Sequence, residues 1–409
     1  MWLLALAACG SDSGMGPPSL EPSPAPLQRP NIILVYADDM GWADASMNGG
    51  PIATPGIDRL AREGARFASF YVPVPICSPS RASLLTGQYP SDHGVVWNGL
   101  VTDPVPTRTT LPPESVTLAE VLREAGYRTA LVGKWGLIDR EDVSSWPISH
   151  GFDFSYGHIG RSQANVFYLN AHETDDKASI AEQAEKYTRY GLEWLAQQPD
   201  VPAFLYLAHD EPHDPYDPTR EADVQRLDQS VSQLLDGLYR LGLSEDTLVF
   251  FTSDNGAPLR KDSSNAPFAG GKTTCEEGGI RMPTAARWPG RIQAGSLVTE
   301  ITSTLDLFPT FVALARGTLP GPRPGHDISG LLTGQAQAVD GAEIACWYKG
   351  WPVTLRQGTW KYHRPYQQNG ERTLLFDLES DPGEWHNVAG GHPDIVDRLE
   401  TRLRELEAR

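Results

Sequence analysis

The chain alternates short apolar runs with longer amphipathic segments over most of its length. Apolar runs bounded by polar residues predict buried strands, which we expect at residues 31–37, 127–132, 203–208 and 247–252. Apolar residues at helical spacing predict helices over residues 115–125, 180–197 and 223–241. Strands that alternate with helices predict an α/β fold with a large, mostly parallel sheet flanked by helices.

The pattern changes after about residue 316. Short runs separated by Gly, Pro and polar residues predict antiparallel strands at residues 345–348, 353–355, 360–363 and 374–377. An amphipathic helix is expected to close the chain at residues 395–407. We therefore predict an α/β domain over residues 31–315 and a smaller C-terminal α+β subdomain over residues 316–409.

Residues 1–30 have a different character. Their apolar start ends at Leu6-Ala7-Ala8-Cys9, which resembles the end of a bacterial lipoprotein signal, where the cysteine receives a lipid anchor. The following residues are rich in Ser, Gly and Pro and predict a flexible tether. This interpretation predicts an exported bacterial lipoprotein, periplasmic or on the cell surface; a chance cysteine is the alternative. Because the run is short and lacks positive residues, we expect the true start to lie upstream.

The chain has four cysteines, Cys9, Cys77, Cys275 and Cys346, and if the first two are modified, Cys275 and Cys346 are the pair that is left. In an exported protein they can form a disulfide, but the sequence does not show whether their geometry permits it. A disulfide and two free thiols therefore both remain open.

The formal net charge of the chain is −18. Nucleic-acid binding requires clustered Lys and Arg, so this charge argues against a nucleic-acid partner. It also opposes the long-range attraction of an anionic substrate. Any such substrate must therefore be held by local positive groups.

Acidic residues follow two of the predicted strands. Asp38 and Asp39 follow the first strand, and Asp254 and Asn255 follow the strand at residues 247–252. Sites in open α/β sheets form beyond the carboxyl ends of strands, where these side chains are expected to meet. Three carboxylates and one amide oxygen suit a hard cation such as Ca²⁺ or Mg²⁺. The alternative is that both segments are simply turns.

The segment that begins at Cys77 predicts an anion site. Ser78 is expected to cap a helix with Pro79 at its first position, so that the helix starts directly after Cys77. Unpaired backbone N–H groups at such a helix start favour tetrahedral anions, and Arg81 lies one turn further on. From the residues alone, Cys77 is either an activated nucleophile or a buried structural cysteine.

The segment Cys-x-Pro-x-Arg followed by Ala-Ser-Leu-Leu-Thr-Gly resembles the maturation signal of the type I, arylsulfatase-like sulfatases of the alkaline phosphatase superfamily. Further blocks typical of the family appear in order at residues 31–39, 54–60, 133–135, 150–153, 211–215, 252–256, 271–283 and 376–384. The resemblance implies an alkaline-phosphatase-like fold with a smaller C-terminal antiparallel sheet. It also implies hydrolysis of organic sulfate esters by a formylglycine, which a maturation enzyme makes from Cys77.

The resemblance also assigns roles residue by residue. It implies that one Ca²⁺ (or Mg²⁺) is bound near the modified Cys77 by Asp38, Asp39, Asp254 and Asn255. Arg81 would hold a formylglycine hydroxyl, and Lys134 would bridge that hydroxyl and the sulfate. His213 and Lys272 would contact the sulfate and assist the leaving oxygen.

The sequence departs from the family pattern at Gly136, where relatives usually carry a histidine that helps to expel sulfate. Another residue takes over that step, the enzyme is slow, or the substrate differs from an ordinary aryl sulfate. The departure keeps open a phosphonate monoester or phosphodiester hydrolase of the same superfamily. A catalytically silent, surface-anchored binding protein is disfavoured, because all four implied metal ligands are present.

Overall fold

The structure is a computed structural model that describes residues 29–98, 108, 110–137, 146–158, 166–176, 178–260, 262 and 264–408. Cys9 and the predicted tether up to residue 28 lie outside the described residues. Among the described residues, no helix combines the length and the apolar character needed to cross a bilayer.

A ten-stranded sheet forms the centre of the molecule. Its strands, in spatial order, are β11 (Ser296–Val298), β2 (Ala65–Phe67), β10 (Ala285–Arg287), β9 (Thr247–Ser253), β1 (Asn31–Ala37), β8 (Ala203–Ala208), β4 (Arg128–Gly133), β5 (Phe154–Gly157), β6 (Phe167–Leu169) and β7 (His172–Thr174). The central strands β9, β1, β8, β4 and β5 are parallel, whereas β10, β6 and β7 introduce antiparallel pairs. The large, mostly parallel sheet predicted from the sequence is confirmed.

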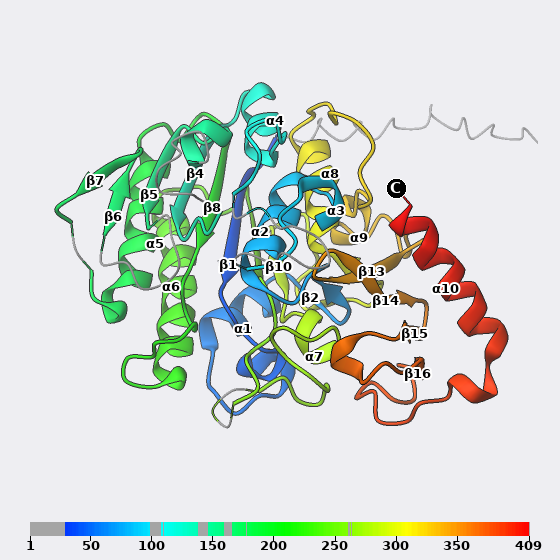
Figure 1. Ribbon diagram of the computed structural model, residues 1–409. Coiled ribbons are helices and arrows are strands. Elements are labelled where there is room, and N and C mark those ends of the chain that lie inside the picture. The colour runs from blue at the N-terminus through cyan, green and yellow to red at the C-terminus, as the bar shows by residue number, and fades with distance from the viewer. Residues whose placement is uncertain are drawn as a thin grey trace, which may run out of the picture.

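Helices cover both faces of this sheet (Figure 1). One face packs against α1 (Pro55–Arg62), α5 (Ile180–Ala196) and α6 (Arg220–Arg240), and the other against α2 (Cys77–Thr86), α4 (Leu118–Glu124) and α8 (Thr304–Leu314). Within β1, Ile33 and Val35 point to the first face, and Ile32 and Leu34 to the second. Because both faces are covered, β1 is a continuous apolar run from Ile32 to Ala37 rather than an alternating one.

Three central helices were predicted, and their observed bounds show where propensity alone was imprecise. The prediction for residues 180–197 matches α5, and that for residues 223–241 matches α6 apart from its first turn, which Thr219 caps through the Ala222 N–H. The helix predicted over residues 115–125 begins at Leu118. Thr117 and Glu120 form a capping box there, which fixes the start of the helix.

The C-terminal part forms a second, four-stranded antiparallel sheet, confirming that prediction. It consists of β13 (Glu343–Tyr348), β14 (Trp351–Gln357), β15 (Trp360–His363) and β16 (Leu374–Asp377), and α10 (Pro393–Glu407) closes it. In Figure 1 this sheet and α10, in orange and red, lie on the side of the molecule away from β6 and β7. Leu355 and Leu403 belong to the same buried cluster as Leu34, so a continuous core joins the two sheets. The division at residues 315 and 316 stays a prediction.

Shorter elements complete the described chain. They are β3 (Phe70–Tyr71), β12 (Thr302–Ser303), α3 (Pro90–His93), α7 (Glu277–Ile280), α9 (Ser329–Leu332) and the 3-10 turns η1 (Trp42–Asp44), η2 (Ser46–Asn48), η4 (Pro147–His150), η5 (Gln367–Asn369) and η6 (Ala389–Gly391). The parallel register of β1, β8, β9 and β4 brings their carboxyl ends to one edge of the sheet. Ala37, Ser253, Ala208 and Gly133 end these strands, and the residues that follow them build the site.

Candidate active site

Cys77 is the first residue of α2, not the residue before it. Ile76 occupies the cap position, and its carbonyl accepts the Ser80 N–H at 3.2 Å. The prediction that Ser78 caps the helix is therefore wrong. The Ser78 hydroxyl instead donates to the Gly136 carbonyl at 2.8 Å, and the Ser78 N–H donates to Asn98 Oδ1 at 3.0 Å. These partners are distant in sequence, which is why local pattern did not show them.

The Cys77 thiol is buried among carboxylates. Its Sγ lies 3.2 Å from Asp38 Oδ1 and 3.8 Å from Asp39 Oδ1, and the residue is 3% exposed. Burial raises the pKa of the thiol well above its usual value, and the negative charges of Asp254 and Asp38 raise it further. A thiol in this setting stays protonated at neutral pH and is a poor nucleophile in its own right.

The four predicted metal ligands meet at the ends of β1 and β9. Asp39 adopts φ 66°, and its backbone N–H donates to Asp254 Oδ1 at 3.1 Å. Asn255 Nδ2 donates to Asp39 Oδ1 at 2.7 Å. Strands β1 and β9 are neighbours in the sheet although the paired residues are 216 positions apart in the sequence. The acidic residues that follow the two strands therefore lie side by side.

The donor set fits a hard divalent cation. The ligand atoms of Asp38, Asp39, Cys77 and His213 all lie within 4.8 Å of one another. The structure thus places His213, which was predicted to contact the sulfate, among the possible metal ligands. Asn255 Oδ1 is buried without a hydrogen-bond partner, which is costly for a carbonyl oxygen unless a cation takes that place. Carboxylate and amide oxygens are the ligands that Ca²⁺ and Mg²⁺ prefer.

Two lysines, an arginine and a histidine surround these carboxylates. Lys134, which follows β4, contacts Asp38, and Lys272 Nζ lies 2.7 Å from Asp39 Oδ2. Arg81 Nη2 lies 2.8 Å from Asp254 Oδ2 and 3.7 Å from Asp38 Oδ2. His213 Nε2 lies 3.6 Å from Asp39 Oδ2. All five side chains predicted to be catalytic, Cys77 included, therefore converge on the acidic group.

The charges in this cluster shift one another's titration. Burial opposes ionisation of Asp38, but Lys134 and the neighbouring cations outweigh it and hold the pKa of Asp38 well below its usual range. Burial raises the pKa of Asp254 to about 7, and repulsion from Asp38 adds to the effect. Burial disfavours charged Lys134, yet the attraction of Asp38 raises the pKa of this lysine. Lys134 is therefore positive at neutral pH and suited to hold an anion.

Several supporting residues were not predicted from the sequence. Arg81 lies 5.3 Å from the centre of the Tyr36 ring, and its Nη1 is 3.4 Å from the hydroxyl of Tyr206. Arg220 Nη2 donates to the Asp39 carbonyl at 2.6 Å. Tyr36 and Tyr206 lie in predicted strands. A tyrosine with its polar hydroxyl in a mostly apolar run is the sequence feature that could have indicated their supporting role. Arg220 carried no such signal.

Gly136 faces the site, as its place in the sequence implied. It adopts φ 74°, a conformation that favours glycine. A Cβ atom there would lie 3.6 Å from both Arg81 Cδ and Lys134 Cε, which is ordinary van der Waals contact. The position therefore has room for a side chain next to two functional groups, but its backbone disfavours one.

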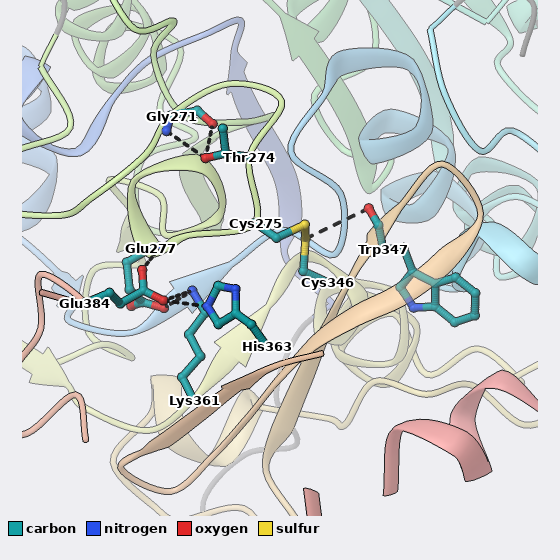
Figure 2. Close-up of a disulfide and its surroundings, with 9 residues drawn as sticks. All are labelled: Gly271, Thr274, Cys275, Glu277, Cys346, Trp347, Lys361, His363 and Glu384. Carbon is teal, nitrogen blue, oxygen red and sulfur yellow. Dashed lines mark hydrogen bonds and ion pairs between the residues drawn. A yellow bond between two sulfur atoms is a disulfide. The ribbon is translucent and has the colours of Figure 1, made fainter. Parts of the chain in front are cut away.

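Cys275 and Cys346 form a disulfide, with their Cα atoms 6.0 Å apart (Figure 2). The bond joins the loop that carries Lys272 to β13 of the C-terminal sheet. In the same region Thr273 N donates to the Pro75 carbonyl at 2.7 Å, so the Lys272 loop also holds the segment that leads into Cys77. The alternative of two free thiols is thereby excluded.

A buried ionic cluster holds the other end of the Lys272 loop to the C-terminal sheet (Figure 2). Lys361 Nζ lies 3.0 Å from both Glu277 Oε1 and Glu384 Oε1, and His363 Nε2 lies 2.8 Å from Glu384 Oε1. The Glu277 N–H donates to Glu384 Oε2 at 2.6 Å. Burial opposes ionisation of Glu384, but Lys361 and His363 outweigh it and lower the pKa of Glu384 to about 2.

Two family models match the chain. The model described as Sulfatase matches residues 30–318, and the model described as N-sulphoglucosamine sulphohydrolase, C-terminal, matches residues 271–409. Among curated proteins, N-acetylgalactosamine-6-sulfatase of Mus musculus is 37% identical over 87% of this chain and 81% of its own length. Arylsulfatase A of Homo sapiens is 33% identical over 94% of this chain and 88% of its own.

Solved structures share the fold. Ps i-CgsB in complex with k-i-k-neocarrahexaose has a TM-score of 0.83 and 28% identity, and the match covers 93% of each chain. BT4656, solved in complex with its substrate D-glucosamine-2-N,6-O-disulfate, has a TM-score of 0.76 and 19% identity, with 93% of this chain and 98% of that chain covered. At 19% identity the second match shows the fold alone.

Proposed function

We propose, for a chain that belongs to the sulfatase family and hydrolyses sulfate esters, that the nucleophile is a formylglycine made from Cys77 and that the substrate is a sulfated sugar. The observation that carries the nucleophile is the setting of Cys77. Burial keeps the unmodified thiol protonated and the charges of Asp254 and Asp38 add to this effect, so the thiol is poorly suited to attack as a thiolate. A modified side chain at the same place escapes this restriction.

We assign the cation site to Asp38, Asp39, Asp254 and Asn255 and propose Ca²⁺ as its occupant, with Mg²⁺ as the alternative. The cation would withdraw charge from the sulfate oxygens, and the hydrated aldehyde would offer two hydroxyls on one carbon, one for attack on sulfur and one for release of sulfate.

The chain's own side chains bind and orient the sulfate. Lys134 contacts the carboxylate of Asp38, and Lys272 contacts that of Asp39. Both ammonium groups can therefore turn to the non-bridging oxygens as negative charge develops there. Arg81 is fully buried and fixed by Asp254, so it holds the residue at position 77 rather than reaching into solvent.

His213 is the proton donor in this proposal. Its side chain is 22% exposed, unlike those of Arg81 and Lys134, so it lies on the side from which the organic part of the substrate must approach. Nε2 would carry the proton that the ester oxygen takes as it leaves. This role does not require the histidine that is missing at Gly136, which in the family acts on the other hydroxyl.

The substrate class rests on the relatives. One of them is an N-acetylgalactosamine-6-sulfatase, and one matching structure, Ps i-CgsB at 28% identity, was solved with k-i-k-neocarrahexaose. The observations give no comparable support to a phosphonate or phosphodiester substrate, or to a silent binding protein. We therefore place both alternatives behind sulfate ester hydrolysis.

The test is hydrolysis of a chromogenic aryl sulfate by the full chain, co-expressed with a formylglycine-generating enzyme and supplied with Ca²⁺. The Cys77→Ala protein, prepared in the same way, is the control. Mass spectrometry of the Cys77 peptide establishes conversion. Turnover that requires both conversion and Ca²⁺ supports the proposal; full conversion without turnover of aryl sulfates or of sulfated sugars contradicts it.

We also propose that Cys9 is lipidated and that the protein is exported, on the evidence of the Leu6-Ala7-Ala8-Cys9 sequence. Metabolic labelling with palmitate in a bacterial host, with Cys9→Ser as control, tests this. Label that persists in Cys9→Ser would contradict it.

A further inference from the structure

The turn between β13 and β14 lies beside the start of α2. Tyr348, the last residue of β13, packs its ring against Trp97 at 5.0 Å in an edge-to-face arrangement. The next residue, Asn98, accepts the Ser78 N–H through Oδ1 at 3.0 Å. Since Ser78 directly follows Cys77, the aromatic pair is connected to the nucleophile position by one hydrogen bond and two peptide units.

The turn is held firmly in this place. Cys346 is bonded to Cys275, three residues after Lys272 (Figure 2). The Trp347 N–H donates to the carbonyl of Pro73, four residues before Cys77, at 2.8 Å. The base of the β13–β14 hairpin is therefore fixed both to the Lys272 loop and to the segment that leads into the nucleophile.

Lys349 stands at the tip of this turn. It adopts φ 50° and is followed by Gly350 at φ 89°, so the chain reverses tightly there. Lys349 Nζ lies 5.3 Å from the centre of the Tyr348 ring and 6.0 Å from that of Trp97. All three side chains are half-buried. Across the part of the chain that the structure describes, no carboxylate lies within 4.0 Å of Lys349 Nζ.

Among the described residues, Lys349 thus has no carboxylate partner, which is notable in a chain with a net charge of −18. The two rings attract its ammonium group by their negative faces, but they carry no net charge to balance it. The proposed reaction at Cys77 does not use Lys349. Aromatic rings with one charged group beside them are the usual composition of a site that orients an organic ligand.

We propose that Trp97, Tyr348 and Lys349 form a second recognition subsite, which binds a sugar ring next to the sulfate ester and an anionic group on that ring. The two rings supply flat apolar surface for the C–H face of a sugar, and the ammonium pairs with a second sulfate or a carboxylate. This subsite rests on the proposed function of the Cys77 site and defines its substrate class more narrowly. The preferred substrate carries at least two anionic groups.

The experiment compares three disaccharides, each with one cleavable sulfate: one has a neutral neighbouring ring, one a neighbouring carboxylate and one a second sulfate. An aryl sulfate serves as the reference substrate. In Lys349→Ala, the ratio of kcat/KM for the doubly anionic disaccharides to that for the aryl sulfate is expected to fall about tenfold, the size of one charge-assisted hydrogen bond. Lys349→Arg should restore most of the ratio. The arm with the larger fall identifies the anion.

Arg291→Ala is the matched control, because it removes the same charge from an exposed position. Arg291 follows β10, which runs antiparallel to β9 and leads away from the site. Its ratio should equal that of the parent protein. A ratio that is unchanged in Lys349→Ala, or that falls equally in Arg291→Ala, would overturn the subsite.

Equilibrium binding separates the subsite from the chemistry. The Cys77→Ser protein is titrated calorimetrically with each disaccharide, with and without Lys349→Ala. A dissociation constant for the doubly anionic sugars that rises about tenfold supports the subsite even if no sulfate is released. If the formylglycine-converted parent protein releases no sulfate, the proposed nucleophile is contradicted, but the subsite stands. Equal dissociation constants for both proteins would overturn the subsite while leaving the proposed function intact.

Discussion

Arg81 holds one carboxylate oxygen of Asp254 with two nitrogens, Nε at 3.0 Å and Nη2 at 2.8 Å. The other oxygen of Asp254 accepts the Asp39 N–H. A single carboxylate therefore ties α2 to the ends of β1 and β9. Both Arg81 and Asp254 are fully buried, so neither charge is compensated by water if the partner is removed.

The buried pair makes Arg81 a stability residue as well as a site residue. Arg81→Gln is expected to lower the free energy of unfolding by about 3–5 kcal/mol, because it leaves a buried carboxylate unpaired. Arg59→Gln breaks a partly exposed pair with Glu63 and should lower it by less than about 1 kcal/mol. Urea denaturation of both proteins, in EDTA, measures the difference. Equal losses would show that Asp254 is not charged in the folded protein.

Calcium is expected to stabilise the folded protein. At about 100 times its dissociation constant, Ca²⁺ should add about 2.7 kcal/mol to the free energy of unfolding. Asn255→Ala removes the buried Oδ1 and should reduce this calcium-dependent gain. Asn369→Ala, in the C-terminal turn, should lower stability while leaving the gain intact, because Asn369 bonds local backbone instead. Thermal unfolding across a calcium titration, with EDTA as the zero point, decides between them.

Replacing Gly136 by histidine, the residue usual at this position in the family, should lower the stability of the protein. Gly136→His is expected to cost about 1–2 kcal/mol, because a residue with a Cβ is disfavoured at φ 74°. Gly358→Ala is the control, since Gly358 adopts φ 61° in an open turn and should show a similar loss for the same reason. Urea denaturation measures both. A Gly136→His protein as stable as the parent would show that the loop rearranges.

The cluster around Glu384 predicts acid sensitivity. Lys361 and His363 hold the pKa of Glu384 at about 2 in the folded protein, well below its ordinary value of 4.5. The stabilisation, about 3 kcal/mol, is complete above pH 4.5 and is lost as the pH falls from 4.5 towards 2. Glu384→Gln should be less stable at pH 7 and should lose less stability over this acid range. Parallel curves for the two proteins between pH 5 and pH 3 would contradict the prediction.

Removal of the Cys275–Cys346 bond should cost about 4 kcal/mol if loop entropy dominates, because the bond joins residues 71 apart. The double substitution of both cysteines by alanine avoids a lone thiol. Its melting temperature should equal that of the reduced parent protein. If the bond also positions Lys272, the double variant should show a higher KM at a temperature where it is still folded.

The sequence predicted those parts of the fold that depend on local pattern. The strands at residues 203–208 and 360–363 match β8 and β15 residue for residue. Two-residue and three-residue strands such as β3 and β11 exist only through their partners, so no run of the chain indicated them. The capping role given to Ser78 was wrong for the same reason, because distant Gly136 and Asn98 take its hydrogen-bonding groups.

The residues of the site could be predicted from the sequence more fully than the contacts that hold them in place. Asp38 and Asp254 were placed together because parallel strands end at one edge, a rule that needs no side-chain detail. The pairing of Cys275 with Cys346 depends on a Cα separation of 6.0 Å, which no spacing in the sequence encodes. Trp97 and Lys349 likewise meet only because the β13–β14 hairpin folds back on the start of α2.

Because Cys77 is buried in the folded protein, its thiol is accessible only before the residues that cover it have been synthesised and folded. The side chains that enclose it come from residues as late as Lys272, and the hairpin that fixes the surrounding loops ends near residue 357. A ribosome therefore exposes this thiol long before it produces the groups that cover it. If Cys77 is converted as proposed, the converting enzyme has this interval in which to reach it, and we expect a chain that folds first to keep the unmodified thiol.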